Sequence, residues 1–95
     1  MGDSLGDAPW IKTNVEAVIG YLTREFENFA VIYQADRALT HTFTVNNGKK
    51  LFKLILGWSI LADKNFTSAP LERLAAEDVA QEMRLHGESG YRWNP

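Results

Sequence analysis

The stretch that decides the fold covers residues 29–63, FAVIYQADRALTHTFTVNNGKKLFKLILGWSILAD. Within it, Asn47-Gly48 is a strong signal for a two-residue hairpin turn of type I′. Such a turn pairs Phe43 with Phe52 on the neighbouring strand. Because side chains alternate between the two faces of a strand, one face of this hairpin is apolar. Its members are Leu39, Phe43, Val45, Phe52, Leu54 and Leu56. The opposite face carries Thr40, Thr42, Thr44 and Lys53, together with Leu51 and Ile55.

A further strand is predicted just before the hairpin, at residues 29–35, where apolar residues occur on both faces. A three-residue turn at residues 36–38 would pair Tyr33 with His41 and direct the aromatic side chains toward the core. A two-residue turn would move every side chain of this strand to the other face. We favour the three-residue turn, and the sequence alone leaves both open.

Amphipathic patterns on both sides of the strands predict two helices. The first covers residues 14–28 with Asn14 as its N-terminal cap, or it begins at Pro9 with Asp7 as the cap. The second begins near residues 67–70 and ends before Gly87, a residue type that commonly follows the last turn of a helix.

These elements predict a single α+β domain over residues 1–95, with residues 1–8 disordered. The expected architecture is a three-stranded antiparallel β-meander with an N-terminal and a C-terminal helix on one face (α-β-β-β-α). Residues 58–61 fit either an extension of the third strand or a helical turn. The tail, residues 90–95, fits either a segment packed against the domain or an additional edge strand. The predicted core consists of Val15, Ile19, Leu22, Phe26, Phe43, Phe52, Leu54, Leu56, Leu71, Leu74, Val79 and Met83.

Composition limits the class of protein. The chain has 95 residues, of which 45% are hydrophobic and 23% charged, and its net charge is −2. These values are typical of a globular domain and provide no global positive field for nucleic acid or anionic membrane. Without cysteine the chain forms no disulfides or thiolate metal sites, which fits a reducing compartment. We expect a cytoplasmic protein with neither a signal peptide nor a membrane-spanning segment.

Residue types that carry chemistry are scattered along the chain. His41 lies on the core face of its predicted strand and His86 in the last turn of a predicted helix, where the helix dipole favours a cation. No carboxylates stand at a spacing that would complete a metal site with the histidines, and no phosphate-binding or nucleophile motif occurs. The sequence therefore predicts a protein that is not an enzyme and has no catalytic residues, bound metal or cofactor.

Lysines gather near the predicted hairpin turn, and Lys49, Lys50 and Lys53 are candidate phosphate contacts. The order of helix, three strands and helix resembles the double-stranded RNA-binding domain, a family that contacts phosphates through a lysine-rich start of its final helix. The corresponding residues 68–72, SAPLE, contain no lysine. We carry over no residue from this resemblance, and we expect nucleic acid not to be the partner.

The function predicted first is protein–protein contact, with a partner protein or with a second copy in a homodimer. The reason is the apolar content of the sheet face that points away from the helices. The candidate interface residues are Thr42, Leu51, Lys53 and Ile55. Two alternatives stay open. One is a nucleic-acid-binding module that uses the lysine-bearing hairpin tip, and the other is a small-ligand or catalytic domain with His41 in a cleft between sheet and helices.

Overall fold

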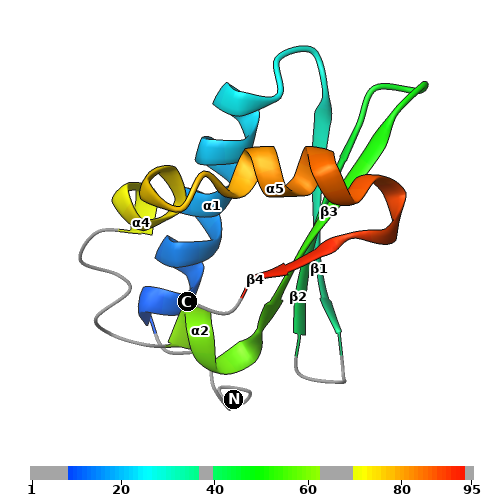
Figure 1. Ribbon diagram of the computed structural model, residues 1–95. Helices are drawn as coiled ribbons and strands as arrows, with labels where there is room; N and C mark the ends of the chain where they lie inside the picture. Colours follow the sequence, from blue (N-terminus) through cyan, green and yellow to red (C-terminus); the bar gives the residue numbers. More distant parts are fainter. Residues whose placement is uncertain (1–8, 37–39, 63–69, 94–95) are drawn as a thin grey trace.

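A computed structural model describes residues 9–36, 40–62 and 70–93 (Figure 1). It is a small α+β domain in which helices pack against one face of a four-stranded sheet. The predicted disorder of residues 1–8 lies outside the described residues. In chain order the elements are α1 (Pro9–Glu25), β1 (Ala30–Asp36), β2 (Thr40–Asn46), β3 (Leu51–Gly57), α2 (Trp58–Ala62), α4 (Pro70–Ala76), α5 (Val79–His86), the 3₁₀ turn η1 (Gly87–Ser89) and β4 (Tyr91–Trp93).

The sheet has the order β1-β2-β3-β4, and the pairing of β3 with β4 is parallel. The predicted three-stranded antiparallel meander is therefore wrong, because it lacks the fourth strand and the parallel pairing of that strand with β3. Parallel neighbours need a long crossover connection, and the helices between β3 and β4 provide it. Of the two alternatives for the tail, the additional edge strand is confirmed. It pairs with β3 and places Trp93 opposite Leu56.

The β2–β3 hairpin has a longer loop than predicted, because Asn46 pairs with Leu51 and four residues lie between them. The Oδ1 atom of Asn47 accepts hydrogen bonds from the backbone N–H groups of Lys49 and Lys50, at 2.9 and 2.7 Å. Of the two predicted turn residues only Gly48 has a positive φ, +89°, so the predicted type I′ turn is wrong. The register moves by two residues, and a shift of two leaves every side chain on its predicted face.

The β1–β2 pairing is also shifted by two residues. Asp36 pairs with Thr40, so that Tyr33 lies opposite Phe43 and not opposite His41 as predicted. Val31 and Tyr33 still pack against the core, as the three-residue turn implied, and the residues between the two strands lie outside the described part of the chain.

For the first helix and for residues 58–62 the structure selects one of the alternatives that the sequence left open. The first begins at Pro9, so Asn14 is not its cap but a buried residue whose Nδ2 donates to the backbone oxygen of Leu61, at 2.7 Å. Residues 58–62 are helical, which resolves the ambiguity of that segment.

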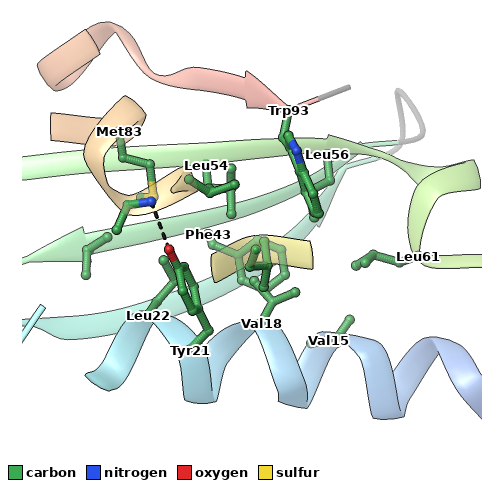
Figure 2. Packing of buried hydrophobic residues seen from close by; sticks show 14 of the residues in the cluster. Val15, Val18, Tyr21, Leu22, Phe43, Leu54, Leu56, Leu61, Met83 and Trp93 are labelled. Carbon is green, nitrogen blue, oxygen red and sulfur yellow. Dashed lines mark hydrogen bonds between the residues drawn. The ribbon is translucent and has the colours of Figure 1, made fainter. Parts of the chain in front are cut away.

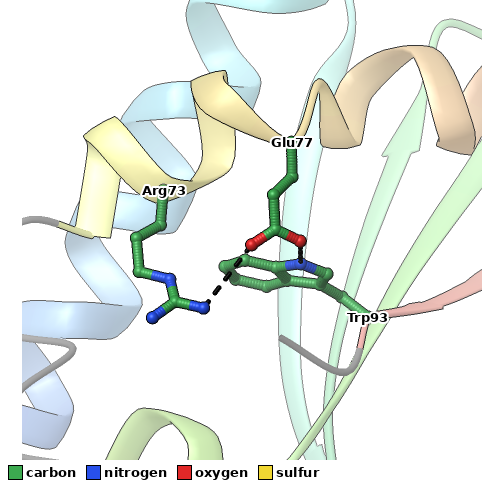
Figure 3. A network of polar contacts seen from close by, with 3 residues as sticks. All are labelled: Arg73, Glu77 and Trp93. Carbon is green, nitrogen blue, oxygen red and sulfur yellow. Dashed lines mark hydrogen bonds and ion pairs between the residues drawn. The ribbon is translucent and has the colours of Figure 1, made fainter.

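The predicted C-terminal helix is two helices, α4 and α5, separated at Asp78, whose φ and ψ of 50° and 51° are left-handed. This break places Glu77 beside Trp93, where Glu77 Oε1 accepts a hydrogen bond from the indole Nε1 at 2.7 Å (Figure 3). Glu77 also forms an ion pair with Arg73, at 3.5 Å.

The core lies between the helices and the inner face of the sheet (Figure 2). Nine predicted core residues are buried, namely Val15, Leu22, Phe26, Phe43, Leu54, Leu56, Leu74, Val79 and Met83. Ile19 and Phe52 are partly buried. The side chain of Leu71 is not among those that the structure describes. The prediction missed buried residues that include Val18, Tyr21, Leu61 and Trp93. Tyr21 is polar, and its hydroxyl accepts a hydrogen bond from Ala80 N–H at 3.0 Å.

Candidate functional site

A groove of about 570 Å³ opens at the hairpin end of the domain. Three segments that are distant in sequence form it: the end of α1 with the following turn, the β2–β3 loop with the start of β3, and the end of α5 with η1. Its lining consists of Glu25, Phe26, Glu27, Phe29, Lys49, Lys50, Leu51, Phe52, Arg84, Gly87 and Glu88.

Three phenylalanine rings form the apolar part of the groove. The Phe26 ring centroid lies 5.5 Å from those of Phe29 and Phe52, which are 6.0 Å from each other. Phe26 is buried, whereas Phe29 and Phe52 are partly exposed and pack on the core from its edge. The groove therefore offers two aromatic surfaces on a rigid base.

Arg84 fixes the junction between α5 and α1. Its Nη2 donates to the backbone oxygen of Glu25 at 2.8 Å, in the last turn of α1, where carbonyl groups lack partners within the helix. Its guanidinium carbon lies 4.6 Å from the centroid of the Phe26 ring, a cation–π geometry. These two contacts hold a positive charge at the wall of the groove.

The loop places two further cations there. The Asn47 side chain holds the backbone of Lys49 and Lys50, while the side chains of both lysines are exposed. Three carboxylates, Glu25, Glu27 and Glu88, also line the groove. Among the described residues no ion pair joins any of these six charged groups. The lining thus combines unpaired charges of both signs with an apolar base.

The structure separates the three lysines that the sequence grouped as candidate phosphate contacts. Lys49 and Lys50 line the groove, on the helix side of the sheet. Lys53 lies opposite Thr44 on the outer face, which carries none of the buried core. Alternation along β3 directs Lys53 away from the loop lysines, so only Lys49 and Lys50 belong to the groove, and a role of the three lysines in phosphate contact stays a prediction.

The four candidate interface residues share the outer face. Thr42 lies opposite Ile55, Lys53 opposite Thr44, and Leu51 opposite Asn46 at the start of β3, where Leu51 also borders the groove. All four are partly exposed. The tail aromatics do not join them, since Trp93 is buried and Tyr91 packs against the core.

His41 lies in the core and does not line the groove. Its Nδ1 is 2.7 Å from the hydroxyl oxygen of Tyr33, and its ring stacks on Trp58 with a centroid distance of 4.3 Å and an interplanar angle of 14°. Burial lowers the pKa of His41 from 6.5 to about 4. The imidazole is therefore neutral at pH 7.

Sequence reasoning found the two loop lysines of the groove but not its other polar residues. Arg84 lies 59 residues from Glu25, and no local pattern links them. The sequence assigned Phe29 and Phe52 to strands. Their rings are partly exposed because the neighbouring helices and strands end beside them, which a local pattern does not indicate. In residues 9–36, 40–62 and 70–93, no three His, Cys, Asp or Glu side chains are grouped to hold a metal ion. No helix of that part is long and apolar enough to cross a membrane.

Comparison with known proteins finds no relative for this chain. No family model matches it, and neither the curated proteins nor the solved structures contain a match. The groove must therefore be interpreted from its own geometry and charge.

Proposed function

We propose that the protein is a non-enzymatic interaction domain that holds a short peptide segment of another protein in the groove. An aromatic or large aliphatic side chain of that segment packs on Phe29 and Phe52, and an adjacent carboxylate meets Lys49 and Lys50. The observation that supports this most directly is the combination of partly exposed phenylalanine rings with cations that form no ion pair among the described residues, in one groove. A cytoplasmic location belongs to the same proposal, because a chain without cysteine fits a reducing compartment.

The size of the groove favours a small occupant. Its volume of about 570 Å³ falls within the range of about 300–1,000 Å³ that is typical of ligand sites in proteins. A peptide would fill it with a few side chains.

The distribution of charge argues against a polyanion as the occupant. Glu25, Glu27 and Glu88 line the groove beside the cations, and the whole chain has a net charge of −2. A nucleic acid would bring phosphates close to these carboxylates. A peptide with one carboxylate next to an apolar side chain can meet the lysines and avoid the glutamates.

Burying one large apolar side chain contributes about 1.5–3 kcal/mol, and association costs rigid-body entropy. Because 3 kcal/mol alone corresponds to a dissociation constant of about 6 mM, we expect binding of about 10 mM or weaker for a single anchor residue and tighter binding for a longer segment.

The test is an NMR titration of the ¹⁵N-labelled protein with N-acetyl-phenylalanine, which carries an aromatic ring next to a carboxylate. N-acetyl-phenylalaninamide has the same ring without the charge and serves as the matched ligand. We expect shifts at Phe29, in residues 49–52 and in residues 84–88, with the acid bound about 3- to 10-fold more tightly than the amide.

The double variant Lys49→Gln/Lys50→Gln should bind the acid only as tightly as the amide. Lys12→Gln, which removes an exposed lysine of α1 outside the groove, should leave the preference for the acid unchanged. Shifts confined to other surfaces, or equal binding of acid and amide to the unaltered protein, would contradict the proposal. Tight, salt-sensitive binding of a single-stranded oligonucleotide that the double variant abolishes would favour the nucleic-acid alternative.

A further inference from the structure

The two edges of the sheet differ in length. β1 forms one edge with seven residues, Ala30–Asp36, and β4 forms the other with three. An edge strand presents backbone N–H and C=O groups without strand partners, and proteins commonly protect such edges with lysine, proline or bulges. Residues 30–35 of β1, AVIYQA, contain neither a charge nor a proline.

The core is also incompletely closed at the β1 edge. On the inner face Phe43, Val45 and Leu54 of the central strands are fully buried, whereas Val31 and Tyr33 of β1 are partly exposed. On the outer face Ile32 is 57% exposed, and only one other large hydrophobic residue of the described part, Leu85, is exposed in the same way. Apolar side chains on both faces of β1 thus lack full cover.

We propose that a second copy of this chain covers this edge by antiparallel pairing of the two β1 strands, which joins the two sheets into one of eight strands. Residues that pair directly across antiparallel strands lie on the same face of a sheet. A twofold axis at Ile32 therefore sets Ile32 against Ile32 of the partner subunit on the outer face. It sets Val31 against Tyr33 of the partner subunit on the inner face, in line with the core.

The sequence of β1 favours its own copy as the occupant. With the axis at Ile32, every inner-face pair is apolar, and the remaining outer-face pair joins Ala30 to Gln34 of the partner subunit. No charged group faces another charged group within residues 30–34. No residue of β1 lines the groove, and this pairing does not require the proposed peptide site, although Phe29, directly before β1, lies opposite Ala35 of the partner subunit in this register.

Light scattering behind a sizing column, run from about 10 µM to about 500 µM, tests the pairing because dimer formation depends on concentration. We expect the mass to rise from 10.7 kDa toward twice that value. Ile32→Lys should keep it at the monomer value, since a lysine at the axis sets two like charges opposite each other. Leu85→Lys is the matched control, because Leu85 is 69% exposed on α5, and this variant should dimerise like the unaltered chain.

Hydrogen exchange of the same samples separates loss of pairing from loss of folding. The amides of residues 30–34 that point away from β2 should become more protected as the concentration of the unaltered protein rises, while those of β3 stay protected in both lysine variants. A mass of 10.7 kDa throughout would overturn the proposal. A dimer that persists in Ile32→Lys would also overturn it. If that dimer is lost in Ile55→Glu, the interface lies on the outer face of the sheet.

Discussion

At the scale of single residues, His41 is the most constrained ionisable group of the core. The stacked Trp58 ring and the Tyr33 hydroxyl surround it, and its Nε2 has no hydrogen-bond partner among the described residues. A charge on this ring would lose its hydration, and no carboxylate among the described residues would compensate for it. The predicted position of His41 on the core face of its strand is confirmed, and its side chain is fully buried.

The stability of the domain should fall when the pH drops from about 6.5 to about 4. The folded-state pKa of His41 is lowered from 6.5 to about 4, so in this window the unfolded chain binds a proton that the folded protein does not. Above pH 6.5 the imidazole is neutral in both states and contributes no pH dependence. At pH 4 the loss relative to pH 7 is about 3 kcal/mol from this group alone.

Urea unfolding at several pH values between 4 and 7 measures this loss. His41→Phe keeps an aromatic ring on Trp58 but cannot bind a proton, and the carboxylates titrate equally in both proteins. The free energy of unfolding of the variant should therefore decline less with falling pH. Parallel curves for the two proteins would show that His41 does not titrate as its burial requires.

At the scale of elements, the β2–β3 hairpin shows how side chains determine a loop. Asn46 Oδ1 accepts from Gly48 N–H at 2.7 Å, and Asn47 Oδ1 accepts from two further amides of the loop. These bonds satisfy the N–H groups of Gly48, Lys49 and Lys50 with side chains of the loop itself. The dipeptide Asn-Gly correctly indicates where the chain reverses, but its neighbours decide the length of the loop.

Asn47→Gly should distinguish the two loops. In a type I′ turn glycine suits this position and the change would be close to neutral. In the observed loop Asn47 does not have a positive φ, and glycine removes two hydrogen bonds, so we expect a loss of about 1–2 kcal/mol in the free energy of unfolding. The control is Asn28→Gly, where φ is 70° and glycine should be neutral or stabilising. Equal effects at both positions would contradict the observed loop.

At the scale of the whole molecule, alternation and helical periodicity were enough to predict which faces of the strands and which helices form the core. A register error of two residues left those faces intact, which is why the core prediction succeeded although both hairpin registers were wrong. β4 could not be derived in this way, because three residues carry too little pattern. The position of β4 depends instead on a crossover whose described part contains α2, α4 and α5.

The candidate site was less predictable than the fold. Lys49 and Lys50 were identified from their charge next to a turn. The groove exists only because the ends of α1 and α5 meet above that turn, with Arg84 bonded to Glu25. Contacts between residues so distant in sequence leave no local signal in a single chain.

Trp93 connects β4 to the rest of the domain, so its loss should be costly. It is 1% exposed, and its indole donates to Glu77 at the break between α4 and α5. Trp93→Ala should lower the free energy of unfolding by about 3–5 kcal/mol, through the cavity and the lost bond. Tyr91→Ala, on the same strand at a partly exposed position, should cost clearly less in the same denaturation experiment. A Trp93→Ala protein as stable as Tyr91→Ala would mean that β4 contributes little to the core.

The unequal edges of the sheet also determine how far assembly can proceed. If two copies join through β1, both β1 edges are used at once, and the ends of the combined sheet are two β4 strands. In the described part of the chain each presents three residues, with an exposed arginine, Arg92, at the centre. A strand this short and charged is a poor template for another chain. In such an assembly the asymmetry between the two edges would limit each sheet to one partner, so that growth would end at a closed pair and would not continue into a fibre.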